Sequence, residues 1–164
     1  MSAPRNEIQQ AARSTARLAA VQGLYQMDIA GTDINAVIHD LTISPLRDLS
    51  QLEAGDGAEL PQPDATFLAE LLRGVVRLQR DIDPMVDGQL AKGWRLARVD
   101  SILRAVLRSA VFELIERREV PARVVINEYI EIARAFLGHD EPRVVNGVLD
   151  KLARKLRPDE FQSA

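Results

Sequence analysis

The chain contains no cysteine and only two histidines among its 164 residues. The absence of cysteine excludes disulfide bonds and thiolate metal ligands, and it fits a reducing compartment. Neither His39 nor His139 has a second metal ligand one helical turn away. We therefore expect no metal site, and we expect both histidines to be solvated rather than catalytic.

Long apolar runs are also absent. No run approaches the ~20 residues that a helix needs to span a bilayer. The N-terminal sequence, MSAPRNEIQQ, lacks the apolar core of a signal peptide. We expect a cytoplasmic protein that does not bind membranes, and its length suits one domain.

No stretch alternates apolar and polar residues with the period of two that is typical of strands, whereas several long stretches have helical periodicity. The sequence therefore predicts an all-α bundle of about seven helices in two subdomains. The N-terminal helical subdomain is expected over about residues 6–48 and the C-terminal one over about residues 64–158. An acidic loop over about residues 49–63, which is rich in Gly and Pro, separates them.

Residues 101–115, SILRAVLRSAVFELI, have the widest apolar surface in the chain. On a helical wheel this surface covers about 220°, whereas a surface helix needs only a little over 100°. We expect other helices to cover this one on several sides. The apolar residues are Ile102, Leu103, Val106, Leu107, Ala110, Val111, Leu114 and Ile115.

Aspartates precede several expected helices and are candidate N-caps, namely Asp33 (with Thr32 as the alternative), Asp64, Asp100 and Asp140. Asp83 followed by Pro84 is typical of an N-cap and a first helical position. We therefore expect a separate short helix over residues 85–93.

Three small or polar residues interrupt apolar helical stretches near the C-terminus. Gly147 lowers the stability of a helix by about 1 kcal/mol relative to Ala, so we expect another helix backbone to cross closely there. Asn127 and Asn146 are expected to bond to backbone groups at helix junctions.

The net charge of −3 is unevenly distributed. Residues 1–30 have a balance of +1, residues 31–66 have −6, and residues 143–158 have +4. Both ends are basic relative to the acidic stretch between them, which permits a polyanionic partner.

Residues 6–30 are predicted to form one amphipathic helix. Its apolar face consists of Ala11, Leu18, Val21, Tyr25 and Ile29, and its polar stripe consists of Asn6, Gln10, Arg13 and Arg17. Two guanidinium groups one turn apart can bind neighbouring phosphates. We expect Arg13 and Arg17 to lie off the apolar face, in solvent.

Motifs of enzymes are absent from the sequence. It has no GxGxxG, P-loop or nucleophile elbow. Glu128 and Glu131 share a helix, but no partner or pocket is indicated for acid–base chemistry, so solvated or ion-paired carboxylates are the better interpretation. We expect no enzymatic activity and no cofactor.

Three blocks together resemble the NusB family of bacterial transcription antitermination proteins. They are AARSTARLAAVQGLYQ (residues 11–26), ILRAVLRSAVFEL (residues 102–114) and VPARVVINEYIEIARAFLGHDEPRVVNGVLDKL (residues 120–152). The last block is the most specific, since INE, the ARAFLG turn and VNGVLD match in order and spacing. The resemblance covers about residues 11–158, and residues 46–63 look like an insertion.

The resemblance implies a NusB-like, two-subdomain RNA-binding fold without catalytic activity. Family members bind the boxA element of nascent RNA together with the small-subunit ribosomal protein that acts as NusE. The complex joins RNA polymerase and the other Nus factors and suppresses premature termination on ribosomal RNA operons. Members occur as monomers and as dimers, so a homodimer stays open.

The resemblance also implies RNA-binding residues. The arginine-rich first helix of the family matches Arg13 and Arg17, but Ser14 and Thr15 stand where other members often have further Arg or Lys. Fewer phosphate contacts imply weaker and less salt-sensitive binding. Tyr25 matches a family aromatic near the RNA surface, and our helical wheel places it beside the apolar face.

A second contact region of the family matches residues 138–144. Members commonly have Lys-Phe where this chain has Arg143 and Val144. Arg143 keeps the charge, but Val144 cannot stack on a base. Asp140 belongs to the same turn, where an N-cap role competes with a role in RNA or partner binding.

Two alternatives remain open. One is a stand-alone relative of the N-terminal domain of a ribosomal RNA cytosine methyltransferase. It is disfavoured because that enzyme needs a further C-terminal domain with a catalytic cysteine. The other is a helical protein-binding adaptor without RNA contact, which the thinned arginine motif leaves open.

Overall fold

The structure, a computed structural model, describes residues 2–43 and 61–162, without the side chains of residues 2–4 and of Arg98. Within these ranges the chain forms six α-helices and two short 3-10 helices and contains no strand. The prediction of an all-α fold is confirmed, and the helix count is close to the expected seven. Most of the expected acidic loop lies outside the described residues.

Two compact units divide the chain, residues 1–73 and residues 74–164, and the boundary between them falls inside α4 (Ala65–Asp87). The first unit contains α1 (Ser2–Ala30), α2 (Ile34–Ile43) and the beginning of α4. The second contains the rest of α4 and the helices that follow it.

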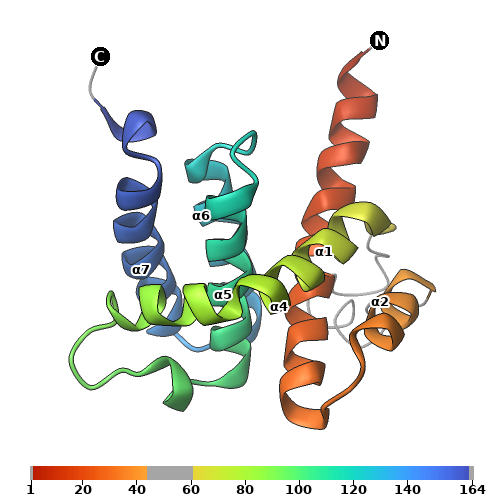
Figure 1. The fold of residues 1–164 in the computed structure, drawn as a ribbon. Coiled ribbons are helices and arrows are strands. Elements are labelled where there is room, and N and C mark those ends of the chain that lie inside the picture. Colours follow the sequence, from red (N-terminus) through yellow and green to blue (C-terminus); the bar gives the residue numbers. More distant parts are fainter. Residues whose placement is uncertain (1, 44–60, 163–164) are drawn as a thin grey trace. The chain divides into compact units, whose positions relative to one another are not determined.

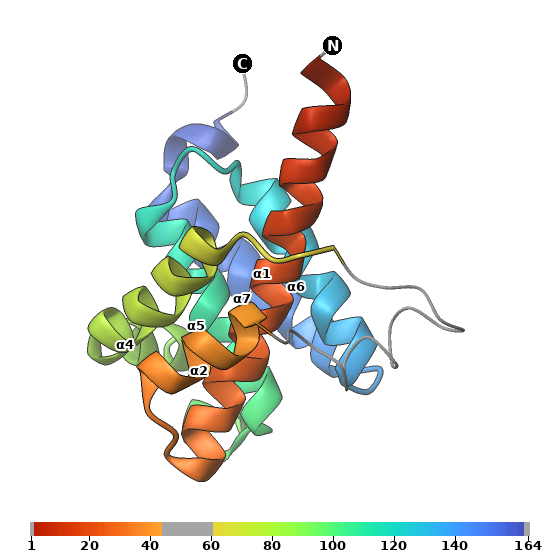
Figure 2. The same ribbon diagram turned by 90° about the vertical axis from the view of Figure 1, so that its right-hand side faces the viewer.

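In the first unit α2 packs against the C-terminal half of α1 (Figures 1 and 2). Gly31 ends α1 with a φ of +64°, which favours glycine, and donates its N–H to the carbonyl of Met27 at 3.0 Å. Gly23 permits the close approach of α2, since a Cβ there would lie 2.8 Å from Val37 Cγ1.

In the second unit α5 (Ser101–Glu116) packs against both α6 (Ala122–Phe136) and α7 (Glu141–Leu156), which also pack against each other (Figure 1). The short helices η1 (Leu96–Arg98) and η2 (Pro158–Phe161) precede α5 and follow α7. Ten of the sixteen residues of α5 are buried, which confirms that the widest apolar surface belongs to a central helix.

Three of the four candidate N-caps accept the expected hydrogen bond. Asp33 accepts the N–H of Asn35 at 3.0 Å, Asp64 that of Phe67 at 3.0 Å, and Asp100 that of Ile102 at 2.8 Å. Asp140 occupies the N-cap position of α7, but its side chain makes no capping bond. The prediction of a side-chain cap at Asp140 is therefore wrong, because its backbone is already helical, with φ −85° and ψ −32°.

The prediction of a separate helix after Asp83 is also wrong, because α4 continues through Pro84 to Asp87. Proline in a helix interior removes one backbone hydrogen bond. The structure accommodates it in the last turn, and the Pro84 carbonyl accepts the N–H of Gly88 at 3.0 Å. Asp83 is not a cap, because its carboxylate forms a bidentate ion pair with Arg108 at 2.8 and 2.9 Å.

Buried polar side chains join the helices of the second unit. Tyr129 on α6 donates its hydroxyl proton to the Glu113 carboxylate on α5 at 2.6 Å, which leaves Ser109 to donate to Tyr129 at 2.8 Å. Arg157, fully buried, donates to the carbonyls of the α5 C-terminus and the following loop and to Glu160. Arg157 therefore does not contribute to the basic C-terminal surface that the sequence suggested.

Candidate RNA-binding surface

Arg13 and Arg17 on α1 share one aromatic ring. The guanidinium carbon of each lies 5.1 Å from the centroid of Phe67, at the start of α4. Asp64 places this ring, since its carboxylate accepts the Phe67 N–H and its own N–H bonds to the Ala12 carbonyl at 3.0 Å. Cation–π contacts of this kind restrict both guanidinium groups and withhold the ring from solvent.

The two arginines differ in exposure. Arg17 is only 3% exposed, whereas Arg13 is half-buried. The expectation that Arg17 lies in solvent is wrong, because its stem follows the buried face of α1 and its guanidinium lies against Phe67. Thr15, also 3% exposed, bonds to the Ala11 carbonyl at 3.0 Å.

Arg13 has an unpaired donor. Its Nε is buried and has no hydrogen-bond partner among the residues that the structure describes. An unpaired buried donor is unfavourable by about 1–3 kcal/mol, and such groups in native proteins require an explanation. Because Nε is itself closed to solvent, a phosphate can bond only to the part of the half-buried side chain that is exposed.

Tyr25 lies three turns beyond Arg13 on the same helix, roughly 18 Å along its axis. The structure exposes 38% of Tyr25 and 61% of Ile29. Two residues that the sequence places on the apolar face of α1 are therefore exposed beyond Leu24. Part of Tyr25 is open to solvent.

Asp140, Arg143 and Val144 lie together in the first turn of α7, in the second unit. Asp140 and Arg143 are exposed and Val144 is half-buried. The N–H groups of Arg143 and Val144 both bond to the Asp140 carbonyl at 3.1 Å. The Asp140 side chain makes no capping bond and is exposed at the surface.

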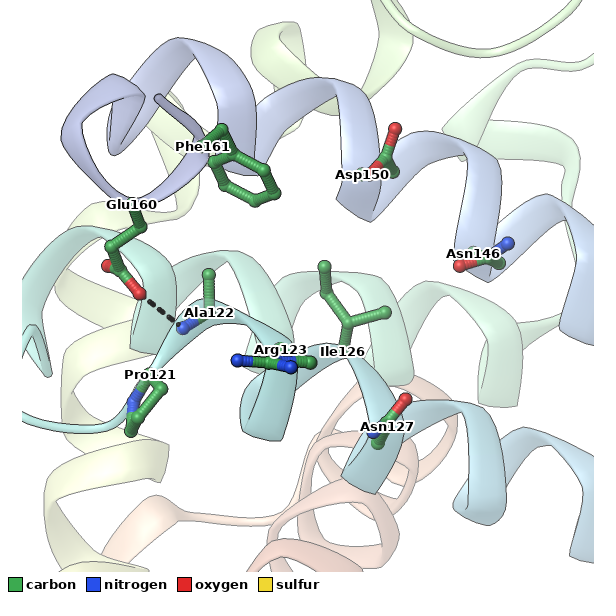
Figure 3. Close-up of a pocket in the computed structure, with 9 residues that line it drawn as sticks. All are labelled: Pro121, Ala122, Arg123, Ile126, Asn127, Asn146, Asp150, Glu160 and Phe161. Carbon is green, nitrogen blue, oxygen red and sulfur yellow. Dashed lines mark hydrogen bonds between the residues drawn. The ribbon is translucent and has the colours of Figure 1, made fainter. Parts of the chain in front are cut away.

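A groove of about 410 Å³ runs between α6 and α7 and is closed at one end by η2 (Figure 3). Asn127 and Asn146 line it from facing helices, and both are exposed. The expectation that they bond to backbone at helix junctions is therefore wrong. Asp150, Glu160 and Arg123 also line the groove, so its lining carries charges of both signs.

Gly147 makes no close helix crossing. A Cβ built on it would meet no atom within 4 Å. Close approach is instead found at Gly74, where a Cβ would lie 2.0 Å from Phe112 Cε1. The helical wheel identifies an unusual glycine, but it does not show what lies opposite.

Among the described residues, no helix is long and apolar enough to cross a membrane, and no three His, Asp or Glu side chains are grouped to hold a metal ion. Glu131 forms an exposed ion pair with Arg134 at 2.7 Å, in agreement with the interpretation of Glu131 as a solvated or ion-paired carboxylate.

Sequence reasoning missed Phe67 as part of the site and assigned it only to an apolar stripe. No local pattern could have identified it, because its contacts with Arg13 and Arg17 join residues about fifty positions apart. The one available signal was the candidate cap at Asp64, which fixes the register of the ring on α4.

Comparison with known proteins identifies the family. The model of the NusB family matches residues 14–154. A transcription antitermination protein NusB from Rhodopseudomonas palustris is 46% identical over 96% of this chain and 88% of its own length. One from Maricaulis maris is 47% identical over 91% of this chain and 90% of its own.

Solved structures agree on the fold. The structure of T. maritima NusB superimposes with a TM-score of 0.72 at 24% identity, covering 91% of this chain and 96% of that one. From the extent of the family match and the identity of the relatives, this chain belongs to the NusB family.

Proposed function

We propose that this chain is a cytoplasmic transcription antitermination factor without enzymatic activity. In this proposal it binds boxA RNA together with the small-subunit ribosomal protein that acts as NusE. The resulting complex joins RNA polymerase and the other Nus factors on ribosomal RNA operons. The observation that carries the proposal is the family match over residues 14–154, together with relatives named as transcription antitermination proteins.

On α1 the proposed RNA contact is centred on Arg13. Its guanidinium is held against Phe67, and the residue is half-buried. Arg17 contributes by fixing the same ring from a buried position, and Tyr25 offers an exposed aromatic surface. Phosphate contacts set affinity and position, and the aromatic ring allows stacking on a base.

On α7 the proposed contact consists of Arg143, Val144 and Asp140. Arg143 supplies charge for a phosphate, and Val144 supplies a small apolar contact. Asp140, whose carboxylate is not needed as a cap, can accept a hydrogen bond from a base amino group or from the protein partner.

The test is a filter-binding titration of boxA RNA and a scrambled RNA, with and without the ribosomal partner. Arg13→Glu and Arg143→Glu are each expected to weaken boxA binding and to reduce the salt dependence, because each removes one phosphate contact. Arg17→Glu is not suitable, since a carboxylate at a buried position would destabilise the fold.

Arg80→Glu is the matched control. Arg80 is exposed on α4, and its substitution changes the net charge by the same amount. We expect it to bind boxA RNA as the unmodified chain does. Equal RNA affinity of all four proteins in the presence of the partner would contradict the RNA half of the proposal and would favour a protein-binding adaptor.

A further inference from the structure

A second cavity in the C-terminal unit contains the only tryptophan of the chain. It has a volume of about 240 Å³ and lies between the α4–α5 connection and the exposed side of α7. Its lining includes Trp94 and Gln89 from the connection and Arg143, Val144, Gly147 and Lys151 from α7. This cavity is distinct from the groove of Figure 3.

The backbone holds Trp94 in place beside α7. Gly93 has a φ of +96°, a conformation that favours glycine, and the Trp94 N–H bonds to the Ala91 carbonyl at 2.9 Å. The tryptophan is half-buried. One part of the indole is therefore packed, and another part reaches the cavity.

Gly147 lines this cavity without a side chain. It lies inside α7, where glycine is less stable than alanine, yet a Cβ there would meet no atom within 4 Å. Packing against another element therefore does not require glycine at this position. The absence of a side chain at Gly147 leaves more space in the cavity that Trp94 also lines.

The charges around the cavity are of one sign. Arg143 and Lys151 line it two turns apart on α7, and none of its described lining residues is acidic. The groove between α6 and α7 differs, since Asp150 and Glu160 line it together with Arg123. An aromatic ring flanked by cations is the arrangement that binds a base of a single strand and its adjoining phosphates.

We propose that this cavity binds one unpaired RNA base, with Trp94 as the stacking surface and Arg143 and Lys151 as phosphate contacts. The inference rests on the proposed function. It also accounts for Val144, since the ring that this position lacks is supplied from the α4–α5 connection. Lys151 and Gly147 thereby become part of the RNA site.

The first test uses Trp94→Ala and Trp94→Phe with boxA RNA and the ribosomal partner present. Loss of a stacked base is expected to weaken binding about 5- to 150-fold, and phenylalanine should restore part of that loss. Because Trp94 is the only tryptophan, its fluorescence in the unmodified chain should change when RNA binds.

A scan of boxA RNAs, each with one abasic nucleotide, locates the base. At one position the abasic RNA should bind the unmodified chain more weakly, and at that position Trp94→Ala should show no further loss. A merely structural role of Trp94 would instead weaken all of these RNAs equally.

The second test separates the cavity from the stability of α7. Gly147→Ala should unfold at the same or a higher temperature, because it removes a helix glycine without a clash, yet it should weaken RNA binding by narrowing the cavity. Asn146→Ala is the matched control, since it changes the neighbouring residue and lines the other groove. It should bind RNA unchanged.

The outcomes distinguish the two proposals. If the unmodified chain binds boxA RNA and the Trp94 and Gly147 variants bind equally well, the base-binding cavity is wrong and the proposed function stands. If the unmodified chain binds no boxA RNA with or without the partner, the proposed function fails, and this cavity fails with it.

Discussion

The Arg157 side chain binds the end of one helix and the loop that follows it. Its guanidinium donates to the carbonyls of Glu113 at 2.9 Å, Leu114 at 3.0 Å and Arg117 at 3.0 Å, as well as to that of Val120, and it forms an ion pair with Glu160 at 3.0 Å. These carbonyls belong to the end of α5 and the loop to α6, where a helix leaves acceptors unsatisfied. Arginine alone offers five donors in a fixed plane.

Arg157→Lys is therefore expected to be strongly destabilising, although it conserves the charge. The ammonium group has three donors on a flexible stem and cannot reach all of these acceptors. Disruption of a buried charged network lowers the free energy of unfolding by about 3–5 kcal/mol. Urea unfolding measures this, and Arg157→Met should lose at least as much.

Arg154→Lys is the control for that experiment. Arg154 is exposed three residues earlier, and its pair with Asp150 at 3.1 Å is an i, i+4 surface pair, for which a change within about 0.5 kcal/mol is expected. Equal unfolding midpoints of the two lysine variants would contradict the role given to Arg157.

The sequence could not reveal the burial of Arg157 or of Arg17. Both are charged residues, and a helical wheel assigns charged residues to the solvent-exposed side of a helix. Their actual positions depend on acceptors or a ring some forty to fifty residues away in the chain. Arg13 departs less from its predicted place in solvent, because it is half-buried rather than buried.

At the scale of the element, the capping aspartates make a prediction about α5 and α7. Asp100→Ala should lower the free energy of unfolding by about 1 kcal/mol, since Asp100 accepts the N–H of Ile102. Asp140→Ala should have a smaller effect, because its side chain accepts no capping bond. Both changes remove a negative charge at a helix N-terminus, so their difference isolates the hydrogen bond.

Thermal or urea unfolding of the two variants provides the measurement. Equal losses at Asp100 and Asp140 would show that charge rather than hydrogen bonding determines the effect. If Asp140→Ala leaves stability unchanged but weakens RNA or partner binding, the carboxylate has the surface role that we propose for it.

The packing of α4 on α5 makes a second prediction at this scale. Gly74→Ala places a methyl group 2.0 Å from Phe112 Cε1, and Phe112 is only 3% exposed. Overpacking of this kind lowers stability by about 1–3 kcal/mol. Gly147→Ala, a glycine in another helix interior with open space around it, should be neutral or stabilising.

A double-mutant cycle checks the cause. In a Phe112→Leu background, Gly74→Ala should be less destabilising, because the clashing ring atoms are gone. An unchanged loss would mean that the backbone of Gly74, rather than its contact with Phe112, is what matters.

Helix positions were the most predictable feature of this chain, since they depend on local periodicity and caps. The α5 helix begins after Asp100 and α1 ends at Gly31, as their sequences indicate. Pro84 shows the limit of such signals. The pair Asp83-Pro84 is a good helix start in isolation, but Arg108 on α5 binds the Asp83 carboxylate and α4 continues past it.

At the scale of the whole molecule, the proposed RNA binding by a chain with a net charge of −3 requires a few well-placed cations, because the overall field of the chain does not attract a polyanion. Arg17 and Arg157, which belong to the basic N-terminal and C-terminal segments, are buried and therefore cannot contact phosphates. The proposed phosphate contacts are then Arg13, Arg143 and Lys151, of which the first is half-buried and the others are exposed.

This small set predicts the salt dependence of RNA binding. Each phosphate contact with a single strand contributes about −0.7 to the slope of log K against log salt concentration, so the three proposed contacts give a slope of roughly −2. Titrations at several salt concentrations with the unmodified chain should give this value. Arg13→Glu, Arg143→Glu and Lys151→Glu should each make the slope shallower by about one contact.

A slope several times steeper would require cations outside this set and would make the proposed surface incomplete. The ribosomal partner must be titrated separately, because its own cations also release counterions. If the partner and the RNA bind one molecule together, the factor by which the partner tightens RNA binding equals the factor by which RNA tightens partner binding. A factor of one in both directions would contradict coupled binding of the RNA and the partner to this chain.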